Sequence, residues 1–190
     1  MIPRNKGLNV IVLAHCILNQ STRWWTHKKP LRDKGVVWKV LETLAKFRIG
    51  ILQMPCPEFT FCGNPRPPRT KKEYENIPGF KDHCEVLATA VAKGLMEMVS
   101  LSREPKIRVL AIVGVERSPT CGVRETPISK KSDGSFLYAQ TKGLFLEILD
   151  RKLNDLGMNI RFVGLDLEKP EDFVIAIRDL QHQIDVDKHE

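Results

Sequence analysis

The sequence predicts one α/β domain over residues 1–190, with roughly four mostly parallel strands in a single-domain, Rossmann-like sheet and helices on both faces. Short apolar runs, typical of buried strands, alternate with longer segments whose apolar residues recur at helical spacing. This alternation is typical of parallel strands joined by crossover helices. A length of 190 residues allows one substantial core and is short for two domains.

The expected strands are apolar runs bounded by polar or turn-forming residues. They are Leu8–Cys16, Gly50–Cys56, Lys106–Glu116 and Ile160–Leu165. The third is the strongest, because Ile107–Val115 is almost continuously apolar, as in a strand buried on both faces.

The expected helices are Val36–Phe47, Gly79–Leu101, Thr141–Leu156 and Pro170–Ile184. Gly157 is suited to end the third of these helices, and Pro170 suits the first turn of the fourth. The second helix is expected to have one apolar side. That side comprises Val86, Leu87, Ala90, Val91, Leu95 and Met98.

Two long loops are expected to carry function, since long ordered loops usually do. The prolines of residues 55–69 are expected to exclude regular helix and central strand there. Residues 117–140 form the second loop, with a hairpin expected around Asp133-Gly134.

The composition indicates a soluble protein with anionic partners. The net charge is +7 and the pI is about 9.2. This excess of basic residues favours binding partners such as phosphates, nucleotides or RNA. The basic residues that follow the first three strands are Arg23, Lys28, Lys29, Arg66, Arg69, Lys71, Lys72, Arg117, Arg124, Lys130 and Lys131. For any single lysine, an ordinary solvated charge is the better interpretation; for the group, the two interpretations are level. No apolar run is long enough for a membrane span, and Leu8–Leu13 resembles a first strand rather than a signal peptide. We therefore expect a cytoplasmic protein with no membrane partner.

Several familiar motifs are absent from the sequence. There is no G-x-G-x-x-G fingerprint, no G-x-x-x-x-G-K-[ST] phosphate loop and no G-x-S-x-G elbow. There is also no C-x-x-C pair, which disfavours thioredoxin chemistry and zinc ribbons.

Three cysteines, Cys16, Cys56 and Cys121, lie near the ends of three expected strands. The carboxyl ends of parallel strands meet at one edge of a sheet, where ligands bind. Each cysteine alone would be more typical of packing, but the coincidence favours a shared metal centre with one open position. The odd count of five cysteines argues against a disulfide framework. Cys62 is a candidate fourth ligand. Cys84 lies near the start of the expected helix Gly79–Leu101 and is expected to have a packing role.

Three motifs resemble the DUF523 family, whose characterised branch is the 2-thiouracil desulfurases. They are His15-Cys16-Ile17-Leu18-Asn19, Cys56-Pro57-Glu58 followed by Asn64-Pro65-Arg66-Pro67-Pro68, and Arg117-Ser118-Pro119-Thr120-Cys121-Gly122. The resemblance implies that Cys16, Cys56 and Cys121 bind a [4Fe-4S] cluster in which one iron has no protein ligand. It also implies that the sulfur of the substrate binds that iron, that water replaces sulfur at carbon, and that sulfide is released.

Glu58 and Ser118 are the candidate catalytic residues. Glu58 lies two residues from Cys56 and could serve as general base, while Ser118 could bind substrate or relay a proton. The alternatives are a capping or salt-bridging carboxylate and a turn serine ahead of a proline. The candidate substrate-binding residues are Arg66, Arg69 and Asn19. For the two arginines, anchoring of the loop to a carbonyl or to an acidic neighbour such as Glu116 is an equal alternative.

The sequence departs from the thiouracil enzymes where substrate would be gripped. The first motif continues as residues 19–25 (NQSTRWW) instead of a Tyr-Asp-Gly-like stretch, and residues 60–63 (TFCG) replace a Gly-Gly-Leu-like loop. These changes favour a different sulfur-containing substrate. Aromatic residues that could stack on a base are Trp24, Trp25, Phe59 and Phe61.

The sequence thus predicts a desulfidase acting on an anionic or nucleobase-like thiolated small molecule, with RNA or a nucleotide as further candidate partners. Three alternatives remain at this point. The cluster could serve sulfur transfer in the opposite direction, or a zinc ion held with Cys62 could stabilise a nucleotide- or RNA-binding module. Catalysis by a single thiol is the third and weakest alternative, because strand alternation would point His15 away from Cys16.

Overall fold

A four-stranded parallel sheet forms the centre of the molecule, in a computed structural model that describes residues 8–27 and 35–186. The strand order is β2 (Gly50–Met54), β1 (Leu8–Ala14), β3 (Ile107–Val115) and β6 (Phe162–Leu165). All three pairings are parallel, with β1 and β3 at the centre of the sheet. The α/β class and the four expected strands are confirmed, with ends displaced by up to two residues.

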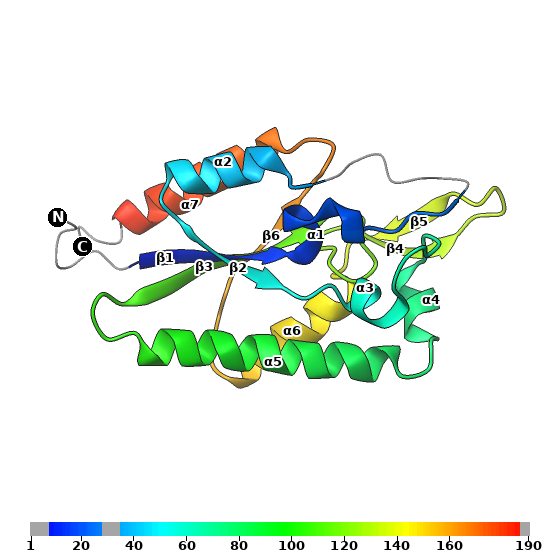
Figure 1. Cartoon of the computed structure of the whole chain (residues 1–190), viewed down its shortest axis with the longest axis horizontal. Helices are drawn as coiled ribbons and strands as arrows, with labels where there is room; N and C mark the ends of the chain where they lie inside the picture. The colour runs from blue at the N-terminus through cyan, green and yellow to red at the C-terminus, as the bar shows by residue number, and fades with distance from the viewer. Residues whose placement is uncertain (1–7, 28–34, 187–190) are drawn as a thin grey trace.

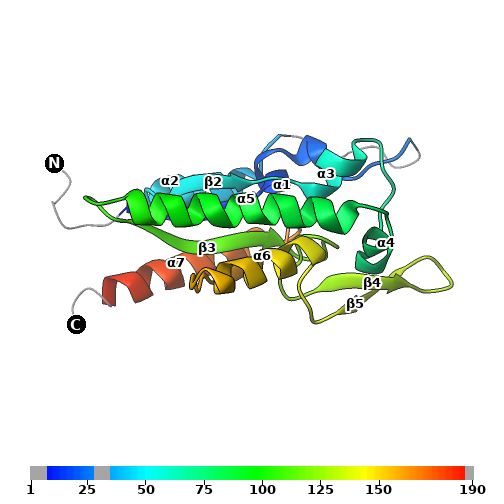
Figure 2. The ribbon, with the colours of Figure 1, turned by 90° about the horizontal axis from the view of Figure 1, so that it is seen from below.

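Helices cover both faces of this sheet, as predicted (Figures 1 and 2). One face carries α2 (Trp38–Lys46) and α7 (Glu171–Val186), and the other carries α5 (Phe80–Leu101) and α6 (Leu144–Asp155). The core between these layers comprises fully buried apolar side chains, including those of Ile11, Leu13, Ile112, Phe145 and Leu149. Among the described residues, no helix has both the length and the apolar character that a membrane span requires.

The buried side of α5 differs from the expected one. Its fully buried residues are Phe80, Cys84, Ala88, Ala92 and Leu95, at intervals of three and four residues. Val86 and Ala90, assigned to the apolar side from the sequence, are exposed. Leu87, Val91 and Met98 are only partly buried. Leu95 is buried as predicted. The assignment was wrong for Val86 and Ala90 because α5 carries apolar residues on more than one side, so periodicity alone did not select the side that packs. The packing role expected for Cys84 is confirmed.

The first strand ends earlier than predicted. β1 stops at Ala14, and His15–Leu18 form a single helical turn, α1, followed by the 3-10 turn η1 (Gln20–Thr22). Cys16 therefore lies on a helix after the strand. The argument from strand alternation about His15 and Cys16 does not apply.

The segment 55–69 contains a short helix that we expected its prolines to exclude. In α3 (Pro57–Cys62), Pro57 occupies the first turn, where its missing N–H has no helical partner to lose. The backbone N–H of Phe59 donates to Cys56 Sγ at 3.4 Å, so the cysteine caps the helix. Gly63 follows with φ of 65°, a left-handed conformation that suits glycine and ends the helix.

Two further elements lie at the same end of the molecule as α3 (Figures 1 and 2). The helix α4 (Lys71–Glu75) begins with a capping box between Thr70 and Glu73. The strands β4 (Thr126–Lys130) and β5 (Phe136–Ala139) pair antiparallel, which confirms the hairpin expected around Asp133-Gly134. Lys130 Nζ lies 2.6 Å from Glu73 Oε1, so the hairpin is attached to α4.

Candidate active site

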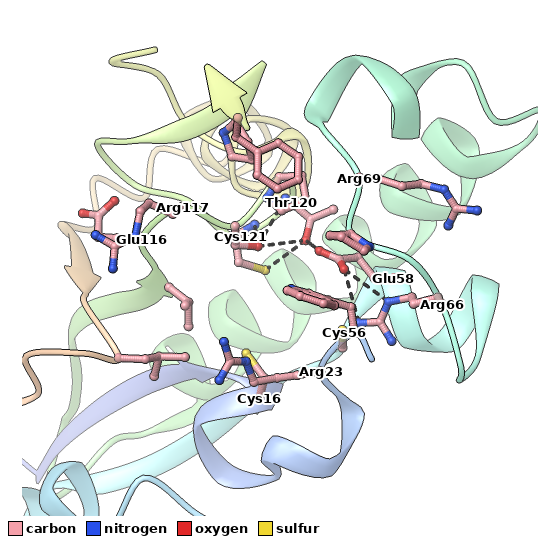
Figure 3. Close-up of a pocket in the computed structure, with 18 of the residues that line it drawn as sticks. Cys16, Arg23, Cys56, Glu58, Arg66, Arg69, Glu116, Arg117, Thr120 and Cys121 are labelled. Atoms are coloured by element: carbon pink, nitrogen blue, oxygen red, sulfur yellow. Dashed lines mark hydrogen bonds and ion pairs between the residues drawn. The ribbon is translucent and has the colours of Figure 1, made fainter. Parts of the chain in front are cut away.

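A cavity of about 240 Å³ opens at the carboxyl edge of the sheet and brings the three predicted cysteines together. Cys16 reaches it from α1 after β1, Cys56 from the residue before α3, and Cys121 from the loop after β3 (Figure 3). Residues that are 40 and 65 positions apart in sequence therefore face one space, because each follows a parallel strand.

Close backbone packing fixes the position of Cys121. Its carbonyl oxygen accepts the N–H of Val115 at 2.9 Å, and its own N–H donates to Ser118 Oγ at 3.0 Å. Gly114 allows this approach, since a Cβ at that position would lie 2.2 Å from the Cys121 carbonyl oxygen. The loop therefore holds Cys121 against the end of β3.

The pKa values of the three thiols are raised well above that of a free cysteine. Burial raises the pKa of Cys16 to about 11 and that of Cys56 to about 12, and the nearby Glu58 carboxylate adds to both shifts. Burial raises the pKa of Cys121 well above its usual value, with further increases from Cys56 and Cys16. The thiols therefore lie close enough to disfavour one another's charge. A positively charged metal centre would reverse this preference, because coordinating thiols are deprotonated.

The thiols of Cys16, Cys56 and Cys121 are the candidate metal ligands that line the cavity. Within residues 8–27 and 35–186, no three His, Cys, Asp or Glu side chains are grouped so as to hold one metal ion. Cys62, the fourth ligand in the zinc alternative, is not among the residues that line the cavity; its Sγ lies 3.8 Å from Arg69 Nη1. Cysteine thiolates are the usual protein ligands of iron–sulfur clusters. Three thiols that line one cavity are donors of this type.

Glu58 lies in the wall of the cavity with both carboxylate oxygens engaged. Oε2 accepts hydrogen bonds from Arg66 Nε and Nη2, at 3.3 and 3.2 Å, and from the Tyr74 hydroxyl at 3.0 Å. Oε1 accepts the Thr120 hydroxyl at 2.7 Å. The Glu58 side chain is 9% exposed and that of Arg66 only 3%. This network fixes a carboxylate beside the three thiols (Figure 3).

The sequence matches one family over most of its length. The family model described as "Putative 2-thiouracil desulfurase" covers residues 8–171. The chain belongs to this family. This match confirms the family resemblance predicted from the sequence. The matched region contains the three cavity cysteines, Glu58 and Ser118.

One curated relative of this family member comes from Methanocaldococcus jannaschii and bears the name "Uncharacterized protein". It is 30% identical over 118 residues, which cover 62% of this chain and 70% of the relative. No solved structure matches the chain.

The other candidate site residues of this desulfurase-family chain differ from one another in their contacts. Ser118 lines the cavity, and its Oγ accepts the N–H groups of Thr120 and Cys121, as a turn serine does. Arg66 also donates from Nη1 to Asn64 Oδ1 at 2.7 Å and to the Gly63 carbonyl. These contacts favour the loop-anchoring alternative for Arg66, with Glu58 rather than Glu116 as the acidic partner.

Arg69 and Asn19 differ in their access to the cavity. Arg69 lines it, with its guanidinium 5.5 Å from the centre of the Tyr74 ring, and no described carboxylate forms an ion pair with it. Asn19 lies outside the cavity lining, and its Oδ1 accepts the N–H of Ser21 at 3.2 Å. Of the four aromatic candidates, only Trp24 lines the cavity.

The basic residues near this edge are mostly neutralised. Ion pairs join Lys71 to Glu147, Arg117 to Asp166, Arg124 to Glu116, and Lys130 to Glu73. Lys28 and Lys29 lie outside the described residues. The basic surplus therefore provides less free positive charge here than the sequence suggested.

Several cavity residues escaped the sequence analysis. The hairpin contributes Phe136 and Tyr138, whose alternate spacing on a strand was the one available signal. Thr120 lies within a recognised motif but received no role. Tyr74 contacts Glu58 from outside the cavity, and nothing in its own segment indicated that contact.

Proposed function

We propose that this protein removes sulfur, as sulfide, from a thiolated small molecule with a planar ring, using a [4Fe-4S] cluster held by Cys16, Cys56 and Cys121. The observation that carries the proposal is the arrangement of three thiols, that of Cys121 buried and those of Cys16 and Cys56 partly buried, and a hydrogen-bonded carboxylate around one cavity. Membership in a family named for 2-thiouracil desulfurases supports the same reaction class. In the overall reaction, water supplies the oxygen that replaces sulfur at carbon, and hydrogen sulfide leaves.

When bound, the cluster supplies an iron without a protein ligand, which suits a soft sulfur atom and polarises a C=S bond. Glu58 orients the attacking water and accepts its proton, while Arg66 and Tyr74 hold the carboxylate in place. Ser118, which lines the cavity, is a candidate donor to the substrate or to the departing sulfur, since its Oγ accepts from the Thr120 and Cys121 N–H groups and keeps its own proton to donate.

The walls of the cavity suit a flat, partly polar substrate. Trp24, Phe136 and Tyr138 provide aromatic surface, and Arg69 provides a guanidinium for an electronegative group. Arg23 and Trp24, which lie in the segment that differs from the pattern of the thiouracil enzymes, also line this cavity. Thiouracil is therefore one candidate among several thiolated rings.

Sulfide release under anaerobic conditions tests this proposal. The reconstituted protein is incubated in parallel with 2-thiouracil, 4-thiouridine and thiolated tRNA, and sulfide is measured with time. We expect release from at least one compound and a loss of about 10²- to 10⁴-fold in Glu58→Gln. Glu75→Gln, on the exposed side of α4, is the matched control and should retain full activity. Iron-loaded protein that releases no sulfide from any of these compounds would overturn the proposal.

A further inference from the structure

Tyr74 contacts the carboxylate of Glu58 from the side away from the cavity. The residue is 1% exposed and does not line the cavity, yet its hydroxyl donates to Glu58 Oε2 at 3.0 Å. Its ring stacks on Phe80, with centroids 4.7 Å apart and an angle of 29° between the planes. A buried tyrosine hydroxyl needs a polar partner, and here the candidate general base Glu58 is one, with the Arg66 guanidinium also interacting with the hydroxyl.

The two oxygens of Glu58 have unequal surroundings. Oε2 accepts three hydrogen bonds, two from Arg66 and one from Tyr74. Among the described residues, Oε1 accepts one donor, the Thr120 hydroxyl. A carboxylate oxygen has about two acceptor positions, so Oε2 is saturated while Oε1 keeps capacity for one more donor. Thr120 lies in the loop that lines the cavity. Oε1, the oxygen that can accept a further hydrogen bond, is therefore on the cavity side of the carboxylate, where the reaction is proposed to occur.

The helix that carries Tyr74 is held on several sides. Glu73 accepts the N–H of Thr70 at 2.6 Å in the capping box and also pairs with Lys130 of the hairpin. Lys71 donates to the carbonyl oxygen of Lys142 at 3.0 Å and contacts Glu147 on α6. These attachments restrict α4, and they fix the place of the Tyr74 hydroxyl. Such outer support is what holds a reacting group in a productive geometry.

We propose that Tyr74 is a positioning residue: together with Arg66 it occupies Oε2 of Glu58 and thereby presents Oε1 to the cavity. The inference rests on the proposed function, in which Glu58 orients water, and it adds which oxygen does so and what selects it. Without the Tyr74 hydroxyl, only the two Arg66 N–H groups hold Oε2, and the carboxylate can rotate with the guanidinium away from Thr120.

The kinetic test is the variant Tyr74→Phe, which removes one oxygen atom and keeps the ring stacked on Phe80. We expect kcat to fall about 10- to 100-fold, the size typical of a misplaced catalytic group, with KM changed less than about twofold and iron content unchanged. Thr120→Ser, which keeps a hydroxyl beside Oε1, should retain most of the activity, and Thr120→Val should not. Wild-type kcat in Tyr74→Phe would overturn the inference and leave the proposed function intact.

A second readout needs no activity. The chain has only two tyrosines, so Tyr138→Phe leaves Tyr74 as the one phenol that can ionise. Burial and the Glu58 charge raise the pKa of Tyr74 far above its usual value. In Tyr138→Phe, tyrosinate absorbance near 295 nm should therefore appear only together with loss of the fold, followed by circular dichroism. In Tyr138→Phe with Glu58→Gln, it should appear at lower pH.

The two failures are distinguishable. If no thiolated compound yields sulfide, the proposed function fails, while the titration still reports the contact between Tyr74 and Glu58. Ionisation of Tyr74 near pH 10 in the folded Tyr138→Phe protein, as for a free phenol, would show that the contact is absent and would overturn the inference.

Discussion

Replacing Arg66 by leucine should destabilise the protein strongly. Arg66 Nη2 lies 3.2 Å from Glu58 Oε2, and both side chains are almost completely buried. Removing one partner of a buried ion pair leaves an uncompensated charge and costs about 3–5 kcal/mol. The Asn64 side chain would also lose its donor. The expected loss is a large share of the about 5–15 kcal/mol by which a domain is usually stable.

The assay is urea unfolding of the reduced apoprotein, followed by circular dichroism and tryptophan fluorescence. A loss of 3–5 kcal/mol corresponds to a fall of about 1–2 M in the unfolding midpoint. Arg69→Leu is the matched control, because Arg69 lies three residues away and has no described carboxylate partner. We expect its stability to change by less than about 1 kcal/mol, with its effect confined to KM.

A double-mutant cycle separates the ion pair from general loop damage. Glu58→Gln with Arg66→Leu removes both charges, so its free energy of unfolding should fall by about 2–3 kcal/mol less than the sum of the two single variants. If Arg66→Leu costs under about 1 kcal/mol, or the two losses simply add, Arg66 does not anchor Glu58 and the reasoning is refuted.

The remaining predictions concern the loop after β3 and the thiols. Gly114→Ala should lower the free energy of unfolding by about 3 kcal/mol, because the new methyl group meets the Cys121 carbonyl oxygen. Gly94→Ala, which has open space around it on α5, should instead raise the free energy of unfolding by about 0.5–1 kcal/mol. Equal effects in the two glycine variants, measured by urea unfolding, would contradict the packing described. In the apoprotein at pH 8, iodoacetamide should modify Cys16 and Cys56 only slowly. A pKa near 11 for Cys16 and near 12 for Cys56 leaves their thiolates about 100- and 1000-fold scarcer than for a thiol of pKa 9. Their rates, measured by peptide mass spectrometry, should rise about tenfold per pH unit up to those pKa values; rates for Cys16 and Cys56 that level off near pH 9 would exclude the burial described.

The meeting of the three cysteines was predictable because it depends on topology. Cys16, Cys56 and Cys121 each follow a strand that the apolar pattern identifies, and parallel strands end at one edge. The bounds of those strands were less predictable. The helical turn at Cys16 has four residues, too few to show a period in the sequence.

The surroundings of Glu58 were not predictable, for a different physical reason. The capping of α3 by Cys56 uses a sulfur acceptor, which is not among the usual capping residues. Tyr74 reaches Glu58 from 16 residues further along the chain. A contact between single side chains of separate segments leaves no periodic signal, so it becomes visible only when the segments are packed.

The pairing of the basic residues illustrates the same limit. Composition correctly gives the net charge of +7, but it does not say which charges are neutralised by neighbours. Arg117 pairs with Asp166, 49 residues away, and Lys130 with Glu73, 57 residues away. Whether the basic residues form a binding surface for a large polyanion such as RNA therefore depends on ion pairs that only the folded structure shows.

The most direct test of the account is the iron and acid-labile sulfide content of five single variants after anaerobic reconstitution. We expect about four of each per chain in the wild type, in Cys62→Ala and in Cys84→Ala, and a loss of the cluster in Cys16→Ala, Cys56→Ala and Cys121→Ala. Loss of iron in Cys62→Ala would mean that a fourth thiolate closes the centre. Full iron content in any of the three cavity variants would contradict the assignment of the ligands.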